Sequence, residues 1–144
     1  MGARALGIDL GERRIGVAVS DAEGRVATPI TVIERSGSRN RDHQRISELV
    51  AEYEAGVVVV GLPLSLDSST GPAAQAAEQE VGELEAALAV PVFTHDERFT
   101  TAIAERALAE SGLSGKARRQ RVDMVAASVI LQSWLDASGS KGQR

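Results

Sequence analysis

Four consecutive valines at residues 57–60 constrain the fold of this chain more than any other feature. A continuous β-branched run is expected of a strand that is buried on both faces. Helices must then cover both sides of the sheet, and a chain with 43% hydrophobic residues has enough apolar side chains for this. Because only 3% of the residues are aromatic, the core must be aliphatic. The run therefore predicts an α/β fold with three layers.

The other elements are predicted from the spacing of apolar residues. Residues 4–10 and 15–21 alternate between large apolar and small or polar side chains, and a turn at 11–14 joins them, which predicts a hairpin. Further strands are expected at about 26–33 and 91–97, helices at about 40–54, 73–88, 100–110 and 122–135, and polar loops at 65–72 and 111–121. A hairpin sheet extended by strands that return through helices fits the three-layer design.

The length of 144 residues fits one domain, which we expect at residues 1–137, followed by a flexible tail at 138–144. The chain has no cysteine, so disulfides and thiolate metal sites are excluded and a metal must be held by oxygen or histidine. The first residues do not have the pattern of a signal peptide, and no apolar run approaches the roughly 20 residues of a membrane span. We therefore expect a cytoplasmic protein with no membrane partner, and a monomer and a homodimer both stay open.

Asp9 lies in the middle of the first strand, on a face made of unusually small residues. These are Gly7, Gly16, Ala18 and Ser20. Another element must approach the sheet closely there, and the last helix offers small residues at Ala126 and Ala127, one turn after Asp123. Such packing would bring two carboxylates together, and they would repel each other unless a hard divalent cation lay between them. The alternatives are a turn aspartate for Asp9 and a helix-capping acid for Asp123.

A third acid comes from the strand end, where Asp96 and Glu97 are adjacent. Strand alternation allows only one of them to face Asp9, and either could instead be an N-terminal acid of the next helix. The two histidines, His43 and His95, are expected to be surface and strand-end residues rather than metal ligands.

The net charge of −4 argues mildly against a nucleic-acid partner, but the cations are unevenly distributed. One group is Arg39, Arg41 and Arg45, and a second is Lys116, Arg118, Arg119 and Arg121. The second group precedes Asp123 directly and is expected to bind the substrate backbone. Arg14 and Arg98 are candidates for holding phosphates, and a structural salt bridge is the equal alternative for each.

Four segments together resemble the YqgF family, whose members are also called RuvX-like Holliday junction resolvases. They are GIDLGERRIGVAVSD, VVVGLPLSLDSSTGP, THDERFTT and KARRQRVDMVAASVILQSWL, and they cover nearly the whole chain. The resemblance implies the RuvC-like branch of the ribonuclease H superfamily, with a mixed five-stranded sheet in the order 3-2-1-4-5. It also implies that Asp9, Glu97 and Asp123 are the catalytic and metal-binding acids, with one or two Mg²⁺ or Mn²⁺ ions.

The activity implied by the resemblance is hydrolysis of phosphodiester bonds during maturation of the 5′ end of precursor 16S ribosomal RNA. Resolution of branched DNA is the alternative within the family. Two departures from the family pattern are Ser65 and Ser68, where asparagine and glycine are common. The helix at 73–88 also lacks the arginines that are often found there.

Two rivals belong to other classes of protein. The segment DLGERRIGVAVSD also suits an actin-like ATPase, but those enzymes bind nucleotide between two such domains, and this chain supplies one. A non-catalytic RNA-binding or ribosome-binding module on a nuclease fold is the second rival. The presence of all three acids argues against it.

Overall fold

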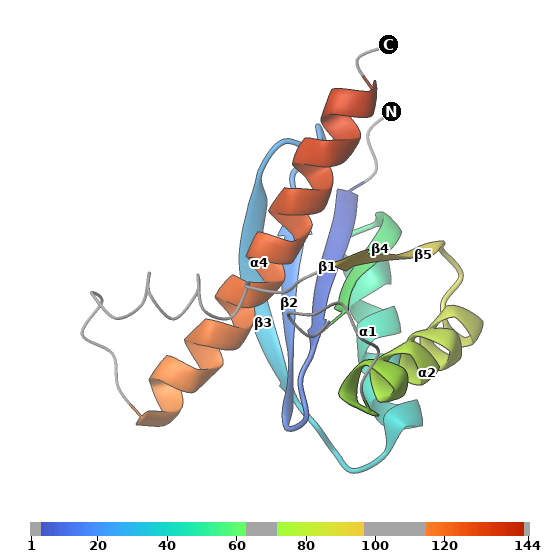
Figure 1. Ribbon diagram of the computed structural model, residues 1–144, viewed down its shortest axis with the longest axis vertical. Helices are drawn as coiled ribbons and strands as arrows, with labels where there is room; N and C mark the ends of the chain where they lie inside the picture. The colour runs from blue at the N-terminus through green and yellow to red at the C-terminus, as the bar shows by residue number, and fades with distance from the viewer. Residues whose placement is uncertain (1–3, 63–71, 97–114, 143–144) are drawn as a thin grey trace.

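Five strands form one mixed sheet at the centre of the molecule (Figure 1). They are β1 (Arg4–Leu10), β2 (Arg14–Ser20), β3 (Ala27–Glu34), β4 (Ala55–Leu62) and β5 (Val92–Asp96). The helices are α1 (Arg39–Glu52), α2 (Pro72–Ala87) and α4 (Gly115–Gly142). The computed structural model describes residues 4–62, 72–96 and 115–142, so most of the expected loop at 65–72 and the expected helix at 100–110 lie outside the described residues.

The order of the strands is β3-β2-β1-β4-β5. The pairs β1–β2 and β2–β3 are antiparallel, and the pairs β1–β4 and β4–β5 are parallel. Helices α1 and α2 cover one face of the sheet and α4 crosses the other (Figure 1). The α/β fold with three layers and the sheet order 3-2-1-4-5 are therefore confirmed.

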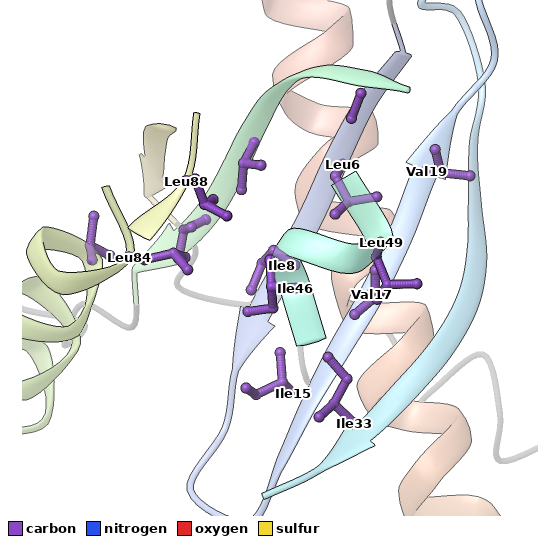
Figure 2. Packing of buried hydrophobic residues seen from close by; sticks show 14 residues of the cluster. Leu6, Ile8, Ile15, Val17, Val19, Ile33, Ile46, Leu49, Leu84 and Leu88 are labelled. Atoms are coloured by element: carbon purple, nitrogen blue, oxygen red, sulfur yellow. The ribbon is translucent and has the colours of Figure 1, made fainter. Parts of the chain in front are cut away.

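The face toward α1 and α2 carries a core of large aliphatic side chains, and Figure 2 shows them between the sheet and the helices. Its largest members include Leu6, Ile8, Ile15, Ile46 and Leu84, all fully buried. The valine run contributes to both faces: Val58 and Val60 belong to this core, whereas Val59 packs with the α4 side chains. All three valines are buried, as a strand covered on both faces requires.

The face toward α4 is built from small residues, and the helix lies very close to it. A methyl group added at Gly7 would lie 2.7 Å from Cβ of Leu131, and one added at Gly16 would lie 2.6 Å from the carbonyl carbon of Asp123. Neither distance is compatible with a real side chain. The predicted close packing of the last helix against the small-residue face is therefore confirmed.

Helix α4 is longer at both ends than the sequence pattern predicts. The expectation of a polar loop up to residue 121 is wrong, because residues 115–121 are helical. The segment from Lys116 to Arg121 consists of lysine, alanine, arginine and glutamine, which all favour helix, and its polarity does not prevent helix formation on an exposed surface. At the other end the helix runs to Gly142, so most of the expected tail has helical backbone. None of the helices in the described part of the chain could cross a membrane.

Candidate active site

Asp9 lies near the end of β1, in a row of residues that runs across the sheet. Its neighbours in register are Gly16 on β2 and Gly61 on β4. Since Leu6 and Ile8 belong to the core under α1 and α2, strand alternation turns Asp9 toward α4. The carboxylate of Asp9 therefore has a glycine on either side and the α4 helix above it.

Asp123 belongs to the first half of α4, where the helix backbone touches Gly16. Because Gly16 pairs with Asp9, this contact brings the two acids to one site. Nε of Arg14 donates a hydrogen bond of 2.7 Å to Oδ2 of Asp123, and both side chains are largely shielded from solvent. The structure thus shows Arg14 in an ion pair with Asp123, which is the arrangement that the sequence left open beside phosphate binding.

The electrostatics of the site favour an added cation. Burial, and then the negative charge of Asp123, raise the pKa of Asp9 from 3.8 to about 6. A divalent ion between the carboxylates would offset both effects, and carboxylate oxygens are the ligands that Mg²⁺ and Mn²⁺ prefer. Within residues 4–62, 72–96 and 115–142 no cluster of three or more potential ligand side chains occurs. Glu97, the expected third acid, lies outside the described residues, as does Arg98.

The second basic group lies on the first turns of α4 rather than in a loop. Arg119 and Arg121 are exposed and Arg118 is half-buried, and the backbone of Lys116 belongs to the same helical segment. Nε2 of Gln120 donates a hydrogen bond of 3.0 Å to Oε2 of Glu34, which ties this segment to the end of β3. Its arginines therefore project from a fixed helix just before Asp123.

The two histidines differ in their surroundings. His95 lies on β5 opposite Gly61, and its Nε2 lies 2.8 Å from Oγ of Ser133, which agrees with a strand-end residue. The expectation that His43 is a surface residue is wrong, because His43 is only 2% exposed. Its Nε2 lies 2.8 Å from Oε2 of Glu80, and this polar contact makes burial of the ring possible.

Sequence reasoning missed Glu80 and its partner Arg35. Both oxygens of the Glu80 carboxylate accept hydrogen bonds from Arg35, at 2.8 and 3.0 Å. A signal was present: Ala77, Val81 and Leu84 form the buried stripe of α2, and position 80 is on the same side of that helix. An acid inside an apolar stripe needs a buried partner, and the sequence gives no indication of which residue it is.

The strand order β3-β2-β1-β4-β5 with helices on both faces defines the class of the fold as RNase H-like. The fold is similar to that of Thermus thermophilus RuvC, with a TM-score of 0.56 and 18% identity over 95% of this chain and 96% of that one. That structure holds RuvC in complex with a Holliday junction substrate. At this identity the likeness shows the fold.

Residues 3–137 match the family model described as RuvX: Holliday junction resolvase, and the chain therefore belongs to this family. A relative from Mycobacterium sp. strain KMS is 48% identical over 134 residues, which is 92% of this chain and 79% of that one. A relative from Listeria monocytogenes is 41% identical over 136 residues, which is 94% of this chain and 99% of that one. Both relatives carry the provisional name pre-16S rRNA nuclease. The predicted class, an enzyme that hydrolyses phosphodiester bonds, is confirmed.

Proposed function

We propose that this chain is a metal-dependent endonuclease that matures the 5′ end of precursor 16S ribosomal RNA in the cytoplasm. The observation that carries the proposal is the meeting of Asp9 and Asp123 at Gly16, with the pKa of Asp9 raised to about 6. A pair of like charges with no function would destabilise the fold, because the two carboxylates repel each other. In a nuclease the same pair is the means of binding a cation beside a phosphate.

Asp9 and Asp123 would hold one or two Mg²⁺ or Mn²⁺ ions, with Glu97 as the third acid. When bound, such ions activate a water molecule and neutralise the charge on the leaving oxygen. The residues of the chain do the rest. Asp9 would hold the cation as a carboxylate, and Arg14 balances the charge of Asp123 and orients its carboxylate. Gly16, the neighbour of Asp9 in register, lets the α4 backbone approach closely enough to bring Asp123 to Asp9.

The basic first turns of α4 would bind the backbone of the substrate. Arg118 and Arg121 are three residues apart on a helix, so they share one side of it. A protein with a net charge of −4 must concentrate its cations to hold a polyanion, and this segment does so close to Asp123. Arg119 lies on the same turns of the helix, and Lys116 and Arg98 are further candidates for holding a phosphate.

RNA is the favoured substrate because relatives with 41–48% identity are named for precursor 16S RNA. The second candidate is branched DNA, which is supported by the description of the family and by the RuvC complex with its junction. The test offers both substrates in parallel to the purified protein with Mn²⁺. We expect specific cleavage near the 5′ end of the mature 16S sequence and no resolution of a four-way DNA junction.

The metal requirement is tested in the same assay. Mg²⁺ and Mn²⁺ should support cleavage, whereas Ca²⁺, which tolerates looser geometry, should not. Full activity in excess EDTA would contradict the proposed mechanism. Binding of RNA without any cleavage under all metal conditions would instead favour the non-catalytic module.

A further inference from the structure

Arg35, the first residue after β3, makes an unusually complete set of hydrogen bonds. Its Nη1 and Nη2 donate to the two oxygens of Glu80, at 2.8 and 3.0 Å, and its Nε donates to the carbonyl oxygen of Gly11 at 2.9 Å. Its backbone N–H donates to the carbonyl oxygen of Arg13, also at 2.9 Å. One residue thus holds two points of the β1–β2 turn and links them to α2.

Glu80 and His43 fix the guanidinium of Arg35 in place. Glu80 is 5% exposed, and burial alone would raise its pKa, but the hydrogen bonds from Arg35 and His43 outweigh burial and leave the pKa below its usual value. Glu80 is therefore ionised and can only accept hydrogen bonds, so Nε2 of His43 must carry the proton in their contact. Three elements, namely α1, α2 and the start of the segment after β3, meet in this cluster.

The turn that Arg35 holds separates two residues of the proposed active site. The backbone N–H of Gly11 donates to the carbonyl oxygen of Asp9 at 3.1 Å and to that of Arg14 at 3.0 Å. Arg14 in turn binds Asp123. A displacement of Gly11 would therefore move the end of the strand that bears Asp9 and the cation that orients Asp123.

Stability alone does not explain this cluster, because a buried ion pair contributes little more than well-packed apolar side chains would. Its directional bonds do fix the position of one turn. We propose that Arg35, held by Glu80 and His43, is a positioning residue that sets Asp9 and Arg14 from the opposite face of the sheet. The inference rests on the proposed function, since it assigns Arg35 to that same site.

A second ion pair joins the same parts of the molecule and serves as the control. Nη1 of Arg39 donates to Oε2 of Glu83 at 2.9 Å, with both side chains more than 40% exposed. This pair also connects the start of α1 to α2. Within the described residues, neither side chain of this pair donates or accepts a hydrogen bond with the β1–β2 turn. Glu83→Gln is therefore matched to Glu80→Gln in chemistry and position along α2.

The experiment compares Glu80→Gln and Arg35→Lys with Glu83→Gln in the full-length protein. The amide introduced by Glu80→Gln would have only one oxygen to accept the two hydrogen bonds from Nη1 and Nη2 of Arg35. A lysine at position 35 could not donate to Gly11 and to both oxygens of Glu80 at once. Three quantities are measured: the NMR signals of the Gly11 amide and the Arg14 Nε–H without metal, the affinity for Mn²⁺, and kcat and KM for the cleaved substrate.

We expect both test variants to shift the Gly11 and Arg14 signals, to weaken Mn²⁺ binding about 10-fold or more, and to lower kcat with little change in KM. Glu83→Gln should leave all three within about twofold of the wild type. If Arg35→Lys fails to fold, Glu80→Gln alone decides the question by the same measurements.

A lower melting temperature with wild-type signals, wild-type Mn²⁺ affinity and wild-type kcat would overturn the inference and reduce the cluster to a structural tie. Failure of the proposed function has a different signature, because the wild-type protein itself would then cleave nothing. In that case the Gly11 and Arg14 signals and the Mn²⁺ affinity still support or overturn the role of Arg35.

Discussion

The two faces of the central sheet solve different problems. Under α1 and α2 the side chains are large, and residues such as Ile8 and Leu84 fill the space between helices and sheet. Under α4 the side chains are small, and the helix backbone touches Gly16. Large side chains on the first face bury apolar surface. On the second face the strand residues are small, so α4 lies close to the sheet and Asp123 comes near Asp9. Both faces bury apolar side chains, but of the described helices only α4 approaches the sheet closely enough to bring the two carboxylates of the proposed site together.

The largest expected effect comes from removing a charge on the α4 face. Asp9→Asn should abolish cleavage, with a loss of at least about a thousandfold, because loss of a principal metal ligand removes most of the stabilisation of the transition state. Single-turnover assays with saturating Mn²⁺ measure it. Turnover close to that of the wild type would remove Asp9 from the site.

The same charge should weaken the fold at neutral pH. A raised pKa means that the folded state binds the Asp9 proton more tightly, so the stabilising contribution is complete below pH 3.8 and is lost as the pH rises through about 6. The shift corresponds to about 3 kcal/mol at most. Urea unfolding in EDTA at pH 5 and pH 7.5 should show a loss for the wild type that Asp9→Asn does not show. Equal pH dependence in both proteins would contradict the burial of Asp9.

A glycine-to-alanine change on the α4 face should lower the stability of the protein, and one on α2 should raise it. Gly16→Ala places a methyl group against the backbone of Asp123 and should cost about 1–3 kcal/mol of stability and most of the cleavage rate. Gly82 lies exposed on α2 with no atom within 4 Å of an added methyl group. Gly82→Ala should therefore stabilise the protein by about 0.5–1 kcal/mol and leave cleavage unchanged. The opposite ranking would mean that α4 does not approach the sheet as closely as described.

The smallest expected effect concerns the basic turns of α4. Replacing Arg118, Arg119 and Arg121 with alanine should weaken substrate binding but change the single-turnover rate at saturation much less, because these side chains hold the backbone and not the metal. The salt dependence of log Kd should fall by roughly 0.7–0.9 for each lost phosphate contact. An unchanged salt dependence would mean that other residues bind the substrate backbone, and Arg39, Arg41 and Arg45 are the next candidates.

Local patterns predicted the features that depend on periodicity. The valine run gave a strand buried on both faces, and the glycines around Asp9 gave the close approach of the last helix. The sheet order came from the resemblance to a family, since spacing along a chain does not specify which strands become neighbours.

Pairings between distant charged residues could not be predicted. The partners Arg14 and Asp123 are 109 positions apart, and His43 is buried only because Glu80 lies beside it. The start of α4 was also missed, because a polar segment that lacks an apolar stripe gives no periodic signal even when its residues favour helix.

The alternation of β1 has a consequence for the quality of any preparation of this protein. Leu6 and Ile8 enter the core on one side, and Asp9 reaches the site on the other. A slip of one residue in strand pairing would turn the acid into the apolar core and turn the large side chains against the closely packed α4 backbone. A molecule with this error could not keep both its core and its active site. If Asp9 and Asp123 bind Mn²⁺ as proposed, the stoichiometry of Mn²⁺ binding would count the correctly paired molecules without any substrate.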